Sequence, residues 1–198
     1  MKTLFFILLL TANVAVFAGS DLPDLAKIKI AAEAGDAEAQ DQLAAQFQSH
    51  GNEQQALIWY RKAAAQNYLH AQSRLGSMLL MRYVMHRDTQ PEARGAVGVE
   101  ARKWVTLAAN AGDKEAEADM AQACLNGWLV RLDYVEAYKW GELAARGSQL
   151  EPSTNTGKTV RDAAVLKMDT AQIEAARKRV ENFAPKTVEF SPPKPKTP

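Results

Sequence analysis

Small and aromatic residues recur at fixed spacing along the chain and predict a set of repeated helices. An Ala is followed three residues later by a Trp, and then by an Ala-Ala pair, in three places. These repeat anchors are Ala56 and Trp59, Ala101 and Trp104, and Ala137 and Trp140. Residues three apart share a helical face, so the small residue lets two helices approach and the indole fills the gap between them. The pattern predicts helix packing rather than a row of sugar-binding aromatic rings.

A second pattern precedes each anchor and predicts a partner helix. Each copy begins just after a helix stop, at Gly35, Asn67 or Gly112, and continues with apolar residues at helical spacing. The spacing between stops is roughly 30 to 45 residues, which is the period of a two-helix repeat. Cys124 occupies one of the apolar positions, so we expect a small buried residue. A lone Cys permits no internal disulfide.

The middle unit is longer than the others, and the excess falls in 81–99. This segment contains Pro91, Gly95 and Gly98, which favour a turn or loop. We expect an insertion between two helices at one edge of the array. Such an insertion is either a binding element or an ordinary surface loop, and the sequence leaves its role open.

The repeat pattern ends at Gly147. Residues 151–157 have the composition of a loop, and a short helix is predicted near Val160 to Lys167. Asp169 should cap a last helix, with Gln172 at the capping-box position. These helices would cover the last repeat, as the ends of a solenoid require.

The two ends of the chain have compositions of their own. Lys2, the apolar run from Leu4 to Leu10 and the small Ala18 indicate a secretory signal cleaved before Gly19. The run is too short for a membrane anchor, so no membrane span is expected after cleavage and the location should be periplasmic or secreted. The predicted organisation is a signal peptide at 1–18, a repeat array at 19–147, capping helices at 148–184 and a disordered Pro/Lys-rich tail at 185–198.

Composition and motif spacing argue against several classes of function. The chain is 47% hydrophobic and 24% charged, with a formal net charge of +1, and it has no basic stripe of the kind that nucleic acid binding needs. His50, His70 and His86 are not at metal-binding spacing, so neither a metal nor a cofactor is predicted. Thr156 to Thr159 has the end of a phosphate-binding loop, but Pro152 stands where that loop needs Gly. No catalytic residues are predicted.

The repeated motif resembles a known family. Ala56 to Ala64, Ala71 with Leu75-Gly76, and Gly112-Asp113 between units are similar to the Sel-one-like repeat (SLR), a relative of the tetratricopeptide repeat. The resemblance covers roughly 22–183. It implies an all-α fold, a right-handed α-solenoid superhelix of antiparallel helix-turn-helix repeats. It also implies a concave surface that binds a protein or peptide.

The leading hypothesis is therefore an exported adaptor or scaffold without enzymatic activity, whose protein or peptide partner and oligomeric state stay open. By analogy with tetratricopeptide arrays, the concave face should carry the first-helix side chains that lie off the apolar stripe, namely Asp41, Gln48, Ser73, Ser77 and Gln122. An alternative is a cell-wall enzyme, a lactam or peptidoglycan hydrolase, suggested by the compartment and by a secreted branch of the family. A third is a structural component whose tail contacts polyanionic polymers.

Overall fold

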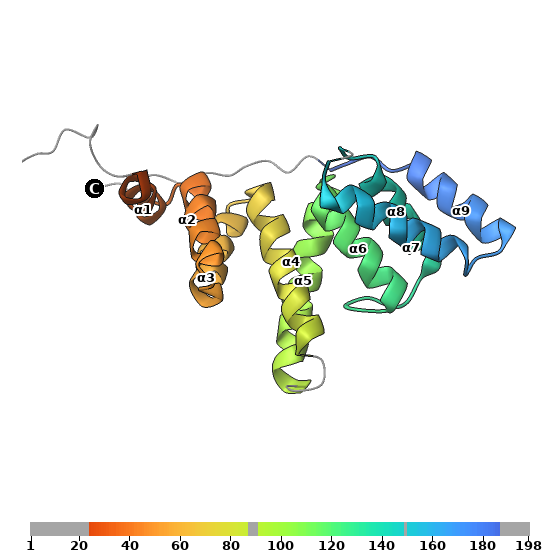
Figure 1. The fold of residues 1–198 in the computed structure, drawn as a ribbon, viewed down its shortest axis with the longest axis horizontal. Coiled ribbons are helices and arrows are strands. Elements are labelled where there is room, and N and C mark those ends of the chain that lie inside the picture. Colours follow the sequence, from red (N-terminus) through yellow and green to blue (C-terminus); the bar gives the residue numbers. More distant parts are fainter. Residues whose placement is uncertain (1–23, 87–90, 149, 187–198) are drawn as a thin grey trace, which may run out of the picture.

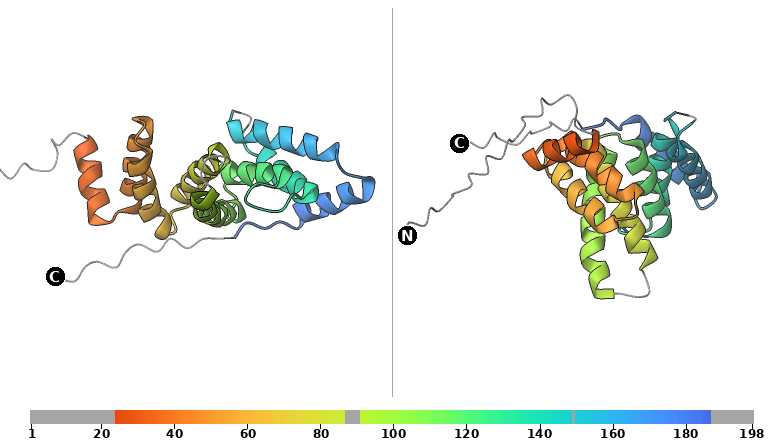
Figure 2. Two further views of the ribbon diagram at one scale, coloured as in Figure 1. Left: turned by 90° about the horizontal axis from the view of Figure 1, so that it is seen from below. Right: turned by 60° about the vertical axis from the view of Figure 1, so that its left-hand side comes forward.

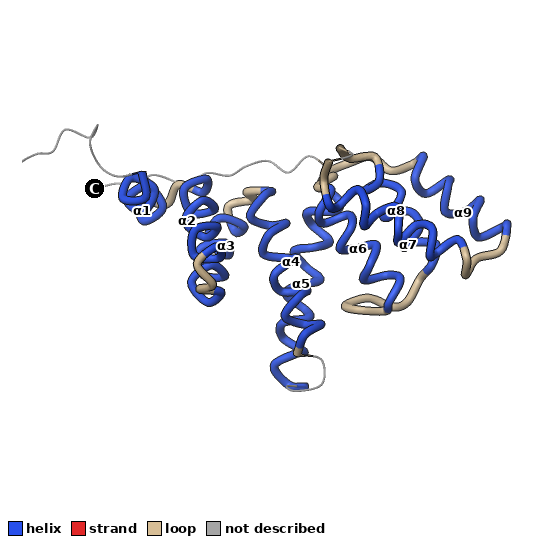
Figure 3. The backbone as a smooth tube through the Cα atoms, in the orientation of Figure 1, coloured by secondary structure: helices blue, strands red, loops and turns tan. Residues whose placement is uncertain are grey.

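The computed structural model describes residues 24–86, 91–148 and 150–186, and within these ranges the regular structure is helical throughout (Figure 3). The predicted signal peptide and residues 187–198 of the predicted tail lie outside them. The helices of the described ranges are α1 (Asp24–Ala34), α2 (Ala37–Ser49), α3 (Glu53–Ala65), α4 (Leu69–Met85), α5 (Pro91–Asn110), α6 (Lys114–Asn126), α7 (Tyr134–Ala145), α8 (Pro152–Val165) and α9 (Thr170–Glu181). The chain is all-α, as the repeat pattern predicts.

The helices form an elongated solenoid. They follow one another along the long axis of the molecule, from α1 at one end to α9 at the other (Figures 1 and 2). Three units are the pairs α2–α3, α4–α5 and α6–α7, and the two helices of each pair pack on each other. The α1 helix packs on α2 at one end, and α8 and α9 pack on the third unit at the other.

The ends of the helices follow from local sequence. At five helices a side-chain oxygen of the capping residue accepts a hydrogen bond from the backbone N–H three residues later. The capping residues are Asp36 at α2, Asn52 at α3, Asp113 at α6, Asp133 at α7 and Asp169 at α9. Gln172 completes the predicted capping box at α9. Asn67 and Gly112 have positive φ angles of 62° and 89°, which end the preceding helices at the predicted stops.

The repeat anchors lie at the contacts between helices. Three alanines have no exposed surface, namely Ala56, Ala101 and Ala137. Trp104 is 8% exposed and Trp140 is 5% exposed. Trp59 is only partly buried against the core around it. A lysine ammonium lies over each indole, 3.6 to 4.2 Å from its centroid. The aromatic rings are therefore packing residues with one cationic neighbour each.

The described residues of 81–99 differ from the predicted insertion between two helices. The excess length lies mostly in two longer helices, because α4 continues to Met85 and α5 already begins at Pro91. Gly98 belongs to α5, and a Cβ there would come within 2.8 Å of the Tyr83 ring. This glycine permits close helix packing rather than a turn. The two helices project beyond the rest of the array (Figure 1), and residues 87–90 between them lie outside the described ranges.

The loop predicted at 151–157 is also wrong, since α8 begins at Pro152. A proline is tolerated in the first turn because its missing N–H would have no partner there. Gly157 allows α8 to meet α7 closely, since a Cβ on it would lie 2.6 Å from the Gly141 carbonyl oxygen. Thr154 is completely buried and donates to the Ser148 carbonyl at 2.7 Å. The small polar residues serve helix packing, and the composition alone did not distinguish that from a loop.

Candidate functional site

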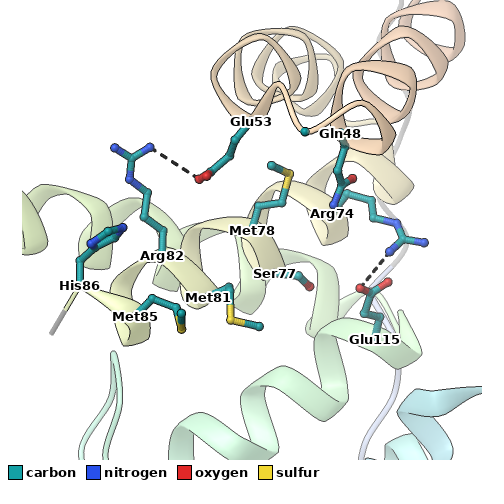
Figure 4. A pocket seen from close by; sticks show the side chains of 11 residues that line it. Gln48, Glu53, Arg74, Ser77, Met78, Met81, Arg82, Met85, His86 and Glu115 are labelled. Atoms are coloured by element: carbon teal, nitrogen blue, oxygen red, sulfur yellow. Dashed lines mark hydrogen bonds and ion pairs between the residues drawn. The ribbon is translucent and has the colours of Figure 1, made fainter.

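A groove of about 590 Å³ follows the exposed side of α4. We call it the methionine groove, and Figure 4 shows it from close by. Its lining comes from α4, from the turn between α2 and α3, and from α6. The lining residues are Gln48, Gly51, Glu53, Arg74, Ser77, Met78, Met81, Arg82, Met85, His86 and Glu115.

Three methionines give this groove its apolar character. Met78, Met81 and Met85 are at i, i+3 and i+7 on α4, so one face of the helix carries all three thioethers. Met81 is 62% exposed and Met85 71% exposed, and both point to the same side of α4 (Figure 4). Unbranched methionine side chains adapt to differently shaped apolar surfaces. Large apolar side chains that stay this exposed within a hollow are typical of a contact surface.

Charged pairs border the methionine groove on two sides. Arg82 of α4 lies 3.7 Å from the Glu53 carboxylate of α3, and Arg74 lies 3.2 Å from the Glu115 carboxylate of α6. All four side chains are about half exposed. Exposed pairs of this kind add little to folding stability, so their main effect is to place two cations and two anions around an apolar floor.

A second, more polar groove of about 720 Å³ lies where the first turns of α4, α6 and α8 come together. Two serine–carboxylate hydrogen bonds join α4 to α6 beside it. Ser73 donates to Asp113 at 2.6 Å, and Ser77 donates to Asp119. Asp113 also caps α6, so its carboxylate fixes the start of that helix and its position against α4.

Asp119 has an unusual environment among these carboxylates. Its pKa is raised to about 7, chiefly by burial, which outweighs the lowering effect of the Ser77 hydrogen bond; the nearby negative charges of Glu115 and Asp113 also raise it. The side chain is therefore divided between its protonated and charged forms near neutral pH. A carboxyl group in this position can accept or release a proton at the contact between α4 and α6.

His70 and Asp41 form a polar contact between α4 and α2. The His70 Nδ1 atom lies 2.8 Å from Asp41 Oδ2, and this hydrogen bond raises the pKa of His70. Half of the histidine side chain is exposed, while the aspartate is buried. The other carboxylate oxygen, Asp41 Oδ1, is buried with no hydrogen-bond partner, so the contact with His70 is made through Oδ2 alone.

The five predicted concave-face residues differ in their surroundings. Gln48 and Ser77 line the methionine groove, and Gln122 lines the polar groove. Asp41 is 6% exposed and Ser73 is 1% exposed, and both are used in hydrogen bonds between helices. The analogy placed polar residues off the apolar stripe at the surface, whereas neighbouring first helices pack through some of them.

The methionines were missed, although their spacing was visible in the sequence. Met81 and Met85 fall in the segment 81–99, where the sequence analysis expected an insertion instead of continued helix. Once α4 is extended to Met85, the i, i+3, i+7 pattern from Met78 is apparent. The charged pairs Arg82–Glu53 and Arg74–Glu115 leave no comparable signal, because their partners come from different helices.

Other reactive groups are separated or buried. Within the described part of the chain, His, Cys, Asp and Glu side chains form no group of three that could hold a metal ion. Burial raises the pKa of the Cys124 thiol to about 12, which keeps it uncharged and unreactive. The Ser77–Asp119 pair joins two helices, and a carboxylate alone is a weak base for a serine hydroxyl.

Comparisons with known proteins define the class of fold. No family model matches this chain, and neither does any curated protein. Among solved structures, the chain is similar to a protective antigen present in uropathogenic Escherichia coli strains, described as displaying an SLR fold, with 25% identity and a TM-score of 0.65. The match covers 80% of this chain and 32% of that one, so the chain spans about a third of the length of that antigen.

The chain therefore has the Sel-one-like repeat fold, an α-solenoid of helix pairs. This confirms the resemblance seen in the repeated motif. In general terms the fold is that of a repeat-based protein-interaction module. Among the helices of the described residues, none is long and apolar enough to cross a membrane.

Proposed function

We propose that this protein is an exported adaptor that binds a segment of another protein in the methionine groove. The observation that carries the proposal is the pair of exposed methionines, Met81 and Met85, one turn apart in a groove of about 590 Å³. This volume is within the range of sites that enclose a few side chains. An apolar segment of a partner would cover thioethers that are otherwise in contact with water, and the gain grows with the area covered.

The surrounding charges would orient the partner. Arg82–Glu53 and Arg74–Glu115 lie on the border of the groove and are open to water, where charged groups set orientation and specificity more than affinity. A helix with apolar residues on one face is the partner that this arrangement suits best, because such helices dock into methionine-lined grooves. The exported location rests on the signal-like residues before Gly19.

We do not propose an enzymatic function. The serine–carboxylate pairs are found at the contact between α4 and α6, and one of the two carboxylates, Asp113, also caps α6. No structural observation favours hydrolysis of a lactam or of peptidoglycan over binding. The role of a structural component that uses residues 185–198 also stays a hypothesis of the sequence alone.

Peptide selection tests the proposal. A random peptide library would be panned on the chain from Gly19 onward, and the affinity of enriched peptides would be measured by fluorescence anisotropy. The double variant Met81→Glu, Met85→Glu should bind at least about tenfold more weakly. Leu166→Glu is the matched control, because Leu166 is 84% exposed and lies outside the groove. Equal affinity of the enriched peptides for the wild type and the double variant would contradict the proposal.

A further inference from the structure

A third pocket lies at the α1 end of the array and shares no lining residue with the methionine groove. We call it the edge pocket. It has a volume of about 580 Å³ and lies between α1, α2 and α3. Its apolar part is formed by Leu25, Leu43, Phe47 and Trp59, and its polar residues include Lys29 and Gln55.

The repeats provide an internal comparison for this pocket. Aligned on their helix stops, Lys29 of α1 corresponds to Arg61 of α3, because Gly35 corresponds to Asn67. Aligned on their tryptophans, Gln55 of α3 corresponds to Glu100 of α5. The pair Lys29 and Gln55, at the contact between α1 and the first unit, is therefore equivalent to the pair Arg61 and Glu100, at the contact between the first and second units.

Between the first and second units this position is closed by a charge pair. The Arg61 guanidinium donates to both carboxylate oxygens of Glu100, at 2.7 and 2.8 Å. The Trp104 indole N–H lies 3.4 Å from the same carboxylate. Glu100 thus joins a cation and an indole, and Trp104 is only 8% exposed.

Between α1 and the first unit the cation and the indole are both kept, while the carboxylate is replaced by an amide. Gln55 carries no charge, and the ion pair that the Lys29 ammonium makes is a loose one, 4.0 Å from Glu33 on the same helix, with both side chains more than half exposed. The Trp59 ring borders an open pocket. The edge pocket therefore has a cation and an indole like those around the Glu100 carboxylate, but its lining residues include no carboxylate.

We propose that the edge pocket is a second interaction site, which takes an acidic side chain and an adjacent bulky apolar side chain from a partner protein. The partner carboxylate would lie at Lys29 in the place that Glu100 has at Arg61. The apolar side chain would pack on Phe47 and the Trp59 ring. This site is separate from the methionine groove and does not depend on it, so one protein could hold two partners, or two segments of one partner.

Capped dipeptides test the proposal. N-acetyl-Phe-Glu-amide would be titrated to about 20 mM, since a ligand of this size binds in the millimolar range. Binding is followed by the NMR signal of the Trp59 indole N–H, which is assigned with the Trp59→Phe variant. N-acetyl-Phe-Gln-amide has the same shape without the charge and should bind at least about fivefold more weakly.

Three variants relate the binding of the acidic dipeptide to the comparison between repeats. Gln55→Glu restores the carboxylate found in the second unit, so it should pair with Lys29 and abolish binding of the acidic dipeptide. Gln54→Glu, which adds the same charge at the exposed neighbouring position, is the matched control and should leave binding unchanged. Lys29→Gln should weaken the binding of the acidic dipeptide to the level of the neutral dipeptide. It should leave the binding of the neutral dipeptide unchanged.

Several results would overturn the proposal. Equal binding of the two dipeptides would show that no carboxylate is recognised. Undiminished binding to Gln55→Glu would show that the pocket is not the position occupied by Glu100 in the second unit. No change of the Trp59 signal at the highest concentration would show that the pocket is not a site. Binding of 3-phenylpropionate as tight as that of the dipeptide would identify a small-molecule pocket instead of a protein-docking site.

Discussion

The Arg61 guanidinium joins α3 to α5 through two hydrogen bonds to the Glu100 carboxylate, at 2.7 and 2.8 Å. The two groups are separated by 39 residues in the chain and come from successive units of the solenoid. In a solenoid, stability is a sum of terms within units and between neighbours. This contact is therefore part of what fixes the angle between the first and second units.

The Glu100→Gln substitution should lower stability by about 0.5 to 1 kcal/mol, because the pair is partly exposed to water. Arg61 lowers the pKa of Glu100. A carboxyl group whose pKa is lower in the folded state stabilises the fold above its ordinary pKa and loses this effect as the pH falls. Urea unfolding at pH 7 and pH 3 should show the full difference between the wild type and the variant at pH 7 and a smaller difference at pH 3.

The tryptophans should differ in their contributions to stability. Trp140 is 5% exposed and meets the Phe183 ring edge-on, with the centroids 5.4 Å apart. Replacing Trp104 or Trp140 by Ala should cost about 3 to 5 kcal/mol. Trp59→Ala should cost clearly less, since its ring borders the edge pocket. Thermal melts of the three variants would measure this order, and an equal loss in all three would contradict it.

Asp119 should make the protein less stable as the pH rises. Its pKa is about 7 when folded, above the ordinary value of 3.8, so between these pH values the folded state binds the proton that the unfolded state has released. Stability then falls as the pH rises through this window. Asp119→Asn keeps an acceptor for Ser77 and removes the charge, so its melting temperature should exceed that of the wild type by at least about 3 °C at pH 8.

The same comparison at pH 4 provides the control for Asp119, because there the wild-type side chain is protonated in the folded protein. The melting temperatures of the wild type and Asp119→Asn should then be nearly equal. A difference that is the same at pH 4 and pH 8 would mean that the substitution acts through packing and not through the charge.

His70 should also make the protein less stable as the pH rises, because a stabilising charge is lost there and not because a buried charge is gained. Its hydrogen bond to Asp41 raises the pKa of the imidazole, and a base with a raised pKa stabilises the fold below its ordinary value of 6.5 and loses this effect as the pH rises. His70→Ala also leaves the buried Asp41 carboxylate without its partner. The substitution should therefore lower the melting temperature more at pH 5.5 than at pH 8.5, and an equal loss at both would contradict the assignment.

Export is tested by the N-terminus of the mature protein. Expression of the full chain in a bacterium should yield a protein that begins at Gly19, determined by N-terminal sequencing of a periplasmic extract. Ala18→Leu places a bulky residue where the signal peptidase needs a small one, so the uncleaved chain should accumulate. A mature protein that begins at Met1 in the cytoplasm would contradict the proposed export.

The repeat positions show how much of the fold could be predicted from the sequence. The Ala-x-x-Trp motif and the stops at Gly35, Asn67 and Gly112 identified the helix pairs, because local periodicity and capping depend on residues close together in the chain. The wrong predictions concern glycines, because a glycine can either form a turn or let two helices pack closely. Gly98 and Gly157 were assigned to a loop, yet each allows two helices to touch, and the partners Tyr83 and Gly141 are known only once the helices are packed.

The candidate sites depended more on tertiary structure. Ser73 and Asp41 were predicted at the surface from their helix positions, and both are buried at contacts with neighbouring helices. Met81 and Met85 shared a helical face in the sequence, but only the packing shows whether such a face is covered. By itself the sequence determined the repeat, the helix ends and the all-α class, since these follow from the spacing of residues near in the chain. Which faces stay open, and which charges meet, was decided by tertiary packing, because residues about 40 positions apart become neighbours only when one unit stacks on the next.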